Sequence, residues 1–138
     1  MKPFKFEVHT PYRQFFSGEI EALTVTLPDG EMTVYAGHSF CTAPVLPGFL
    51  RIRDREGTWK NAFVAEGILE VKGHNTILMA DAAEWPGEID RDRAEKSLAA
   101  AEETIASSML KFEITAATAA RRRAYYRLRV LAAEETPA

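Results

Sequence analysis

The feature that most constrains this chain is a change of residue pattern at Trp85-Pro86-Gly87. All 8 glycines lie at or before Gly87, and no proline follows Pro86 until Pro137. Before the break, hydrophobic and polar residues alternate, whereas after it hydrophobic residues recur at helical spacing. One uniform architecture cannot satisfy both patterns. We therefore expect two domains, residues 1–87 and 88–138.

The first part has the pattern of short strands. Leu23, Val25 and Leu27 alternate with threonines, and Pro28-Asp29-Gly30 then turns the chain. Similar turn signals recur about every 8 to 12 residues, which is typical of an antiparallel sandwich or barrel. The pattern predicts an N-terminal antiparallel β-sandwich of about eight to ten strands, with a core large enough to fold independently.

The second part has the pattern of two helices with a break near Ser107-Ser108. The expected seam residues are Ala94, Leu98, Ala101 and Ile105 in the first helix, and Ala117, Ala120, Ala124, Leu128 and Leu131 in the second. A short polar turn between them predicts a C-terminal antiparallel two-helix hairpin. Alanine buries little surface, whereas ordering costs ~1–2 kcal/mol per residue. We expect a marginally stable hairpin whose position depends on what it docks against.

Charged residues open the first helix. Asp90 suits the N-cap, and Asp92 stands four residues before Lys96. A helix start stabilised by a cap and an ion pair does not explain Arg93, because a cation in the first turn opposes the helix dipole. Arg93 borders the seam, as Arg123 and Arg127 do on the second helix. Because the hairpin is antiparallel, we expect these guanidinium groups to converge, and polyphosphate is an anion suited to several of them at once.

Other functional classes have little support in the sequence. The 3 histidines are scattered, and the chain has neither a G-x-S-x-G motif nor a glycine-rich phosphate loop. The single cysteine, Cys41, has no charged neighbour and is interpreted as structural. No residue pattern indicates a catalytic or metal site.

Nucleic-acid binding is disfavoured by the direction of the arginines and by the net charge of −3. At ~100° per residue, the second-helix arginines point three ways instead of forming one basic stripe. They are Arg121, Arg122, Arg123, Arg127 and Arg129. The chain also lacks an apolar window of ~18 residues and an N-terminal apolar block, so we expect a cytoplasmic location.

Taken in order, several short motifs resemble the epsilon subunit of F-type ATP synthases of the bacterial type. The resemblance covers nearly the whole chain and ends in an alanine-rich hairpin. Its motifs are Phe15-Phe16-Ser17-Gly18-Glu19-Ile20-Glu21, Asp29-Gly30-Glu31 with Gly37-His38, Gly67-Ile68-Leu69-Glu70-Val71, Thr76-Ile77-Leu78-Met79-Ala80-Asp81-Ala82-Ala83-Glu84 and Ile89-Asp90-Arg91-Asp92-Arg93-Ala94.

The resemblance implies a non-catalytic subunit of the central rotor stalk. Its ten-stranded sandwich would sit on the gamma subunit and the c-ring during proton-driven or sodium-driven ATP synthesis. The hairpin would fold against the sandwich or extend along gamma toward the alpha and beta subunits, and the extended form inhibits ATP hydrolysis in bacterial members. Such a subunit is peripheral, on the cytoplasmic face of the bacterial inner membrane, and reaches the membrane only through the complex.

The resemblance also implies site residues. The loop Glu31 to Thr42, including His38, matches the part that meets the c-ring and gamma. Glu84, Asp90, Arg93, Arg123 and Arg127 match positions that bind ATP in some bacterial members, where ATP is a regulatory ligand and no cofactor is required. Two positions depart from the pattern. The run Met32 to Ala36 lacks the usual Gly and Pro, and Ala100 replaces a further arginine, so the expected ATP affinity is modest.

One alternative stays open on the sequence alone: a freestanding β-sandwich binding module with a helical interaction tail, unrelated to any ATPase. Genes for the beta and gamma subunits directly upstream would favour the rotor subunit over this alternative.

Overall fold

The computed structural model describes residues 2–135, which form ten β-strands, one short 3-10 helix and two α-helices. Two compact units are present, Met1–Trp85 and Pro86–Ala138. The division falls inside the Trp85-Pro86-Gly87 break, two residues before the boundary drawn from sequence. Pro137 lies outside the described residues.

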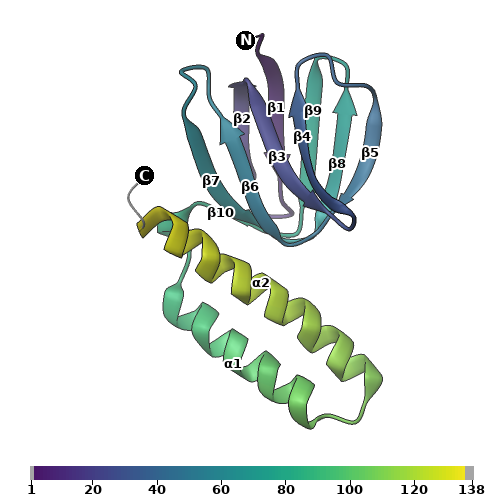
Figure 1. Ribbon diagram of the computed structural model, residues 1–138, viewed down its shortest axis with the longest axis vertical. Helices are drawn as coiled ribbons and strands as arrows, with labels where there is room; N and C mark the ends of the chain where they lie inside the picture. Colours follow the sequence, from purple (N-terminus) through teal and green to yellow (C-terminus); the bar gives the residue numbers. More distant parts are fainter. Residues whose placement is uncertain (1, 136–138) are drawn as a thin grey trace. The chain divides into compact units, whose positions relative to one another are not determined.

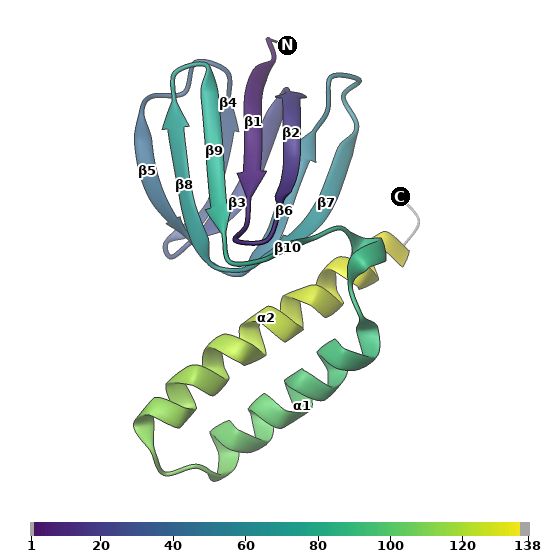
Figure 2. The ribbon, with the colours of Figure 1, turned by 180° about the vertical axis from the view of Figure 1, so that it is seen from behind.

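The first unit consists of two five-stranded sheets that pack face to face (Figures 1 and 2). The first sheet has the order β2-β1-β9-β8-β5 and contains β1 (Phe4–His9), β2 (Gln14–Ile20), β5 (Cys41–Val45), β8 (Gly67–Lys72) and β9 (Asn75–Ala80). The second has the order β10-β7-β6-β3-β4 and contains β3 (Ala22–Leu27), β4 (Gly30–Tyr35), β6 (Gly48–Arg53), β7 (Trp59–Val64) and β10 (Ala83–Glu84). The predicted β-sandwich is confirmed.

One strand pair departs from the antiparallel expectation. Strand β1 pairs with β9 in parallel, with Phe6 opposite Thr76 and Val8 opposite Leu78. Side chains alternate with period two in parallel and antiparallel strands alike, so alternation alone does not reveal direction. The parallel pair joins the first strand of this sheet in the sequence to its last strand.

The sandwich core follows from the alternation that the sequence displays. Phe6, Leu23, Ile52, Leu69 and Leu78 are each at most 2% exposed and belong to one cluster between the sheets. Burying a side chain of this size stabilises the fold by ~1.5–3 kcal/mol. The sandwich is therefore held by several large side chains drawn from both sheets.

Two glycines fix the β8–β9 hairpin. A Cβ added at Gly67 would lie 2.2 Å from the backbone oxygen of Met79, so no larger residue fits where β8 begins. Gly73 has a φ of +51° and forms the turn between the strands. Glycine adopts this left-handed conformation without steric cost. The hairpin brings His74 to the same end of the sandwich as the start of β1, because the Lys5 backbone N–H donates to the His74 carbonyl at 3.2 Å.

The segment expected as a loop from Glu31 to Thr42 is a loop only at its centre. Strand β4 continues to Tyr35 and β5 begins at Cys41. Met32 and Val34 extend the alternation and pair with β3, which explains the longer strand. The remaining loop, residues 36–40, is closed by a bond from the His38 backbone N–H to the Tyr35 carbonyl at 3.2 Å.

The second unit is a helical hairpin preceded by the 3-10 helix η1 (Pro86–Glu88). Helix α1 (Arg91–Ser107) and helix α2 (Lys111–Glu135) run antiparallel, as predicted (Figure 1). Asp90 is the N-cap of α1, and its carboxylate accepts a bond from the Arg93 backbone N–H at 3.1 Å. This bond confirms the predicted start of the first helix.

The turn between the helices is less polar than expected. Ser108 is well bonded, since its hydroxyl donates to Glu113 Oε2 at 2.6 Å and accepts from the Leu110 N–H at 3.1 Å. Met109, however, is 96% exposed, and Leu110 is also exposed. The serines therefore define the turn, while its tip presents apolar side chains.

The seam between the helices consists mainly of alanine. Ala94, Ala101, Ala117 and Ala124 are buried, whereas the larger seam residue Leu98 is only partly buried. Ala101 lies six residues before Ser107 and Ala117 six residues after Lys111, so the two lie level in an antiparallel pair. Ala94 and Ala124 are likewise level, thirteen residues from the same ends. The predicted alanine seam is confirmed.

Candidate functional site

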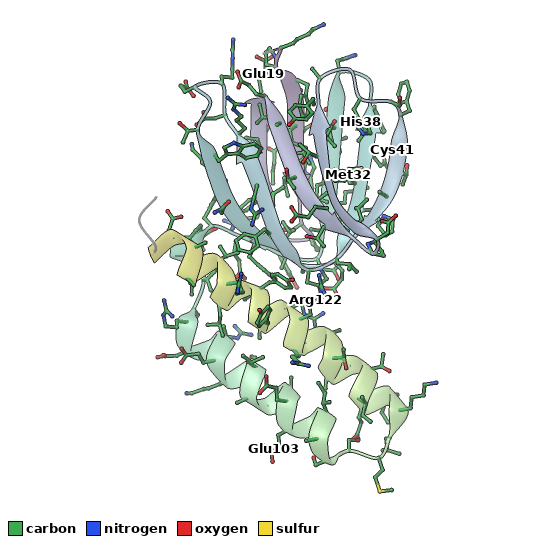
Figure 3. All side chains as sticks on the ribbon, viewed as in Figure 1. Glu19, Met32, His38, Cys41, Glu103 and Arg122 are labelled. Atoms are coloured by element: carbon green, nitrogen blue, oxygen red, sulfur yellow. The ribbon has the colours of Figure 1, made fainter. Side chains whose placement is uncertain are left out.

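The contacts of Arg121, Arg122 and Arg129 place these α2 arginines on two distinct sides of the hairpin. Arg121 Nε lies 3.8 Å from Glu102 Oε1 of α1, which marks one edge of the helix pair. The Arg122 guanidinium lies over the Tyr126 ring, 4.9 Å from its centroid, and Arg129 lies 5.9 Å from the centroid of Tyr125. Figure 3 shows Arg122 in the middle of α2, and Glu103 close to the end of α1 that leads into the turn. Arg121, Arg122 and Arg129 are thus ordered by contacts within the hairpin.

The remaining candidate arginines lie at similar heights along the axis of the helix pair, counted from the turn between the helices. Arg93 is the third residue of α1 and lies fourteen residues before Ser107. Arg123 and Arg127 lie twelve and sixteen residues after Lys111, so the level of Arg93 falls between them. Arg93 is exposed, whereas Arg123 and Arg127 are half-buried.

The contact between Arg121 and Glu102 also orients the helical wheel. With ~100° per residue, Arg123 and Arg127 lie on the side of the α2 seam opposite to Arg121. Arg93 lies on the side of the α1 seam opposite to Glu102. In an antiparallel pair these two sides form the same edge.

The other two candidate ATP-binding residues have different surroundings. Asp90 already uses Oδ1 to cap α1, so its carboxylate is held at the helix start. Glu84 belongs to the sandwich unit, where it is half-buried in β10 and pairs with Phe63 of β7. The hairpin unit by itself therefore carries four of the five residues.

The residues predicted to contact the c-ring and gamma are spread along the sandwich. Glu31 lies near the start of β4, with Oε2 3.6 Å from Arg51 Nη1. His38 lies beyond the other end of β4, and Thr42 pairs with Glu70 on β8. At ~3.4 Å per residue, the length of β4 separates Glu31 from the His38 loop. The three residues do not form one compact site.

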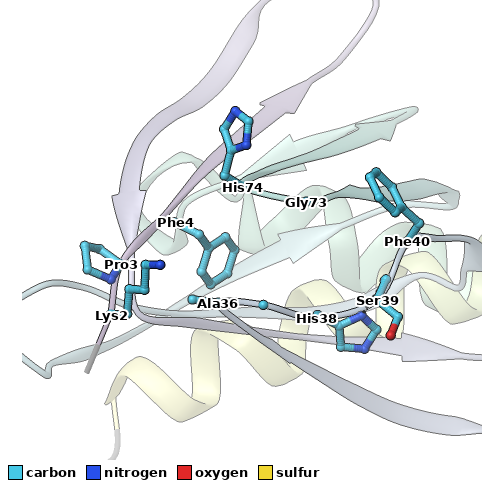
Figure 4. Close-up of a pocket in the computed structure, with 10 residues that line it drawn as sticks. Lys2, Pro3, Phe4, Ala36, His38, Ser39, Phe40, Gly73 and His74 are labelled. Carbon is cyan, nitrogen blue, oxygen red and sulfur yellow. Dashed lines mark hydrogen bonds between the residues drawn. The ribbon is translucent and has the colours of Figure 1, made fainter.

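Sequence reasoning missed a hollow of about 410 Å³ at the end of the sandwich that carries His38. Three segments line it: residues 2–4, residues 36–40 and the turn residues Gly73 and His74 (Figure 4). No local motif marks it, because the sheet order brings the segments together. Gly37 and Gly73 indicate turns, so the sequence could locate two of the lining loops but could not show that they lie together.

One carboxyl group has a shifted pKa. Backbone N–H groups of Thr58 and Glu56 donate to Asp54 at 2.9 and 3.0 Å, and Lys60 lies 3.7 Å away. The Thr58 bond is the largest cause that lowers the Asp54 pKa below its ordinary value. These bonds hold the turn between β6 and β7, which indicates a structural carboxylate.

Residues 2–135 also bear on two other kinds of site. No group of three or more His, Cys, Asp or Glu side chains is arranged to hold a metal ion within this range. Neither of the helices described there has the length and apolarity needed to cross a membrane.

Sequence comparisons agree with the architecture. Residues 3–86 match the family model described as ATP synthase, Delta/Epsilon chain, beta-sandwich domain. The ATP synthase epsilon chain of Caldanaerobacter subterraneus subsp. tengcongensis is 39% identical over 130 residues, covering 94% of both chains. That of Caldicellulosiruptor saccharolyticus is 39% identical over 131 residues, covering 95% of both chains.

Solved structures share the fold. A chain in the cryo-EM structure of Euglena gracilis mitochondrial ATP synthase, OSCP/F1/c-ring in rotational state 1, matches with a TM-score of 0.70 and 20% identity. The match covers 96% of this chain and 79% of that chain. A chain in the Tetrahymena thermophila mitochondrial ATP synthase central stalk/c-ring structure matches with a TM-score of 0.60 and 12% identity, over 92% and 95% of the two chains.

A ten-stranded sandwich followed by an alanine-seamed hairpin therefore defines a two-unit protein of the ATP synthase delta/epsilon type. The chain belongs to the family of ATP synthase epsilon chains. This membership excludes the alternative of a binding module unrelated to ATP synthases.

Proposed function

We propose that the chain is a non-catalytic subunit of the central rotor stalk that couples gamma to the c-ring during ATP synthesis. Proton flow or sodium flow would drive the rotation. The near full-length similarity to ATP synthase epsilon chains supports this role. In the proposed setting the subunit is peripheral, on the cytoplasmic face of the bacterial inner membrane, and touches the membrane only through the ring.

The second part of the proposal is regulation of ATP hydrolysis by the hairpin. The observation that carries it is the alanine seam: of the two helices' buried side chains, Ala94, Ala101, Ala117 and Ala124 are alanines and Val130 is the larger exception. Such a seam buries little apolar area, whereas each ordered residue costs ~1–2 kcal/mol of backbone entropy. A hairpin stabilised this weakly changes its position in response to small inputs. Extended, it would carry its arginines to acidic surface on the alpha and beta subunits and inhibit hydrolysis.

The third part is ATP as a regulatory ligand of the folded hairpin. Within the hairpin, Asp90, Arg93, Arg123 and Arg127 are the residues of the proposed site, and the resemblance to ATP-binding members adds Glu84. Two observations support this site. The three arginines lie at similar heights along the antiparallel helix pair. The contact of Arg121 with Glu102 marks one edge of the pair, which puts the three arginines on the opposite edge. Phosphate accepts bidentate bonds from arginine, so a polyphosphate suits several guanidinium groups on one edge.

The expected size of the ligand effect is adequate for a switch. ATP at 100 times its dissociation constant stabilises the state that binds it by ~2.7 kcal/mol. That free energy shifts a two-state population about a hundredfold. ATP would therefore favour the folded hairpin, and scarcity of ATP would release it.

Calorimetric titration of the purified full-length chain with ATP tests the ligand. We expect binding in the wild type and its loss or marked weakening in Arg93→Ala and Arg123→Ala. Arg121→Ala is the matched control, because Arg121 contacts Glu102 on the other edge. Absence of heat at millimolar ATP, or equal heat in all three variants, would refute ATP binding at this site.

Truncation after Glu88 tests the inhibitory hairpin. The truncated chain keeps the sandwich unit, so the complex should still assemble with it. We expect faster ATP hydrolysis by the assembled complex than with the full chain. Unchanged hydrolysis in a complex that contains the truncated subunit would count against inhibition by the hairpin.

A further inference from the structure

The turn between the two helices exposes three apolar side chains that are close in sequence. Met109 is 96% exposed, Leu110 is 51% exposed and Phe112 is 71% exposed. These three residues are called the hairpin tip below. Neighbouring apolar side chains that stay exposed mark a surface that contacts another molecule. Met109 is the most exposed of the three, and it carries a polarisable thioether.

Met109 differs from the other methionines within residues 2–135. Met32 lies in β4, is partly buried and packs against the sandwich core. Met79 lies in β9, is 45% exposed, and is flanked by Ile68 of β8 and His9 of β1. Met109 lies in a turn, outside any strand pair. Because the oxidation of a thioether follows its exposure, Met109 is the methionine of this range that oxidants reach most easily.

The turn is held by bonds that do not use the Met109 side chain. The Ser108 hydroxyl accepts from the Leu110 N–H at 3.1 Å and donates to Glu113 Oε2 at 2.6 Å. The Ser108 N–H donates to the Thr104 carbonyl at 2.9 Å, which ends α1. A polar group added to the side chain at position 109 stays in water, so it carries no burial cost in the isolated chain. Chemical change at Met109 therefore alters the surface of the hairpin without breaking its turn.

We propose that Met109 is a site of reversible oxidation by peroxides, which switches the hairpin tip from apolar to polar. A lone pair on Met109 Sδ attacks one oxygen of the peroxide. The S–O bond forms as the O–O bond breaks, so sulfur loses two electrons and hydrogen peroxide is reduced to water. A methionine sulfoxide reductase reverses the step with two thiols, which gives the thioether, a disulfide and water.

Oxidation at the tip weakens the extended state of the hairpin. A sulfoxide is polar, so burying it in a protein contact costs free energy that the thioether does not cost. This consequence rests on the proposed inhibition of ATP hydrolysis, in which the extended hairpin contacts the alpha and beta subunits. Oxidation therefore relieves inhibition. The selectivity of the reaction for Met109 depends on exposure alone and does not rest on the proposed function.

Peptide mass spectrometry of the full-length chain during reaction with hydrogen peroxide tests the site. We expect the sulfoxide of Met109 to form at least about twice as fast as that of Met79, following exposed fractions of 96% and 45%, and that of Met32 to form most slowly. A methionine sulfoxide reductase with a dithiol should restore Met109. Oxidation of Met79 or Met32 at the same rate as Met109, or faster, overturns the assignment of the site.

ATP hydrolysis by a reconstituted complex tests the switch. The purified full-length chain is oxidised, freed of peroxide and added to a complex that lacks it. We expect the oxidised wild type to inhibit hydrolysis about threefold less than the reduced wild type, and the reductase to restore the inhibition. In Met109→Leu the treated and untreated chains should inhibit equally, because leucine keeps the tip apolar and has no sulfur. The matched control Met79→Leu retains Met109 and should respond to peroxide as the wild type does.

The outcomes separate the switch from the proposed function. Equal relief in oxidised wild type and oxidised Met109→Leu assigns the effect to another residue, such as Cys41, and overturns the switch. Unchanged inhibition by the oxidised wild type, in a complex that the reduced chain does inhibit, overturns it as well. If the reduced chain and the chain truncated after Glu88 give the same hydrolysis, the proposed inhibition fails and the switch fails with it, while the mass spectra still decide the site of oxidation.

Discussion

The sandwich and the hairpin differ in how their buried surfaces are built. In the sandwich, side chains such as Phe6, Leu23 and Leu78 are completely buried between two sheets. In the hairpin, alanines such as Ala94 and Ala124 occupy the buried positions along the seam, and Leu98 stays partly exposed. The chain therefore contains one unit that buries large apolar side chains and one that buries mainly small ones.

The difference is large in free energy. Complete burial of a Phe or Leu side chain stabilises a fold by ~1.5–3 kcal/mol, compared with ~0.8 kcal/mol for one methylene-sized group. An alanine seam also allows close approach of the helices at little entropic cost, since alanine has no side-chain rotamers to lose. The hairpin therefore forms a defined structure that is weak enough for a ligand or partner to shift it to another position.

The largest expected effect is in the sandwich core. Phe6→Ala removes a side chain with 0% exposure that lies 5.9 Å from the Phe16 ring, and it should destabilise the unit by about 3–5 kcal/mol. Urea unfolding followed by tryptophan fluorescence measures this, because Trp59 and Trp85 both lie in the sandwich unit. The control Phe112→Ala, at an exposed site in α2, should change this transition by less than about 0.5 kcal/mol. Equal effects of the two variants would erase the contrast between the units.

An added arginine at position 100 should strengthen ATP binding by the hairpin. Ala100 is exposed and lies seven residues, or about two turns, after Arg93 on the same side of α1. Ala100→Arg should tighten ATP binding about tenfold by adding a charge-assisted bond on the proposed edge. In Ala99→Arg the guanidinium points about 120° away from Arg93, so calorimetry should show little change. Equal tightening in both variants would indicate nonspecific attraction.

A smaller effect is expected at the start of α1. Asp90→Ala removes the acceptor of the Arg93 N–H bond and should cost about 1 kcal/mol of hairpin stability. Far-UV circular dichroism should show earlier melting of helix, whereas the tryptophan transition of the sandwich should not move. Asp90→Asn keeps a capping acceptor and should restore most of the helix signal. If melting is the same in all three chains, the cap does not limit the hairpin.

The smallest effect concerns pH and lies in the sandwich. The pKa of Asp54 is lowered in the folded chain, mainly by the Thr58 N–H bond. A lowered folded pKa gives stability that is present above the unfolded pKa and is lost as pH falls through the folded pKa. Asp54→Ala should therefore lower the melting temperature slightly near neutral pH and make no difference in strong acid. A difference that persists unchanged in acid would assign the effect to packing.

Much of the architecture was predictable because single residues signal it. Alternation around Leu23 and Val25 indicated strands, the Pro86-Gly87 break indicated the change of class, and Asp90 indicated a helix start. Alanine at helical spacing also indicated the seam, since both helices required a common face. These signals are local, so one sequence suffices to read them.

The remaining features depend on contacts between distant segments. Parallel pairing of β1 with β9 joins Val8 to Leu78 and leaves no mark on either strand pattern. The hollow beside Phe40 needs the turn at Gly73 and the residues before β1, which only the sheet order brings together. The end of β4 at Tyr35 also depends on pairing, since Tyr35 lies opposite Ala22 of β3 and the alternation alone does not show where the strand stops.

Hydrogen–deuterium exchange of the full-length chain, with and without ATP, tests the central claim most directly. We expect backbone amides of residues 91–135 to exchange through openings of much lower free energy than those of β6 and β7, and saturating ATP to slow exchange in the hairpin alone. Hairpin amides as protected as the sandwich core, with exchange unaffected by ATP, would contradict it.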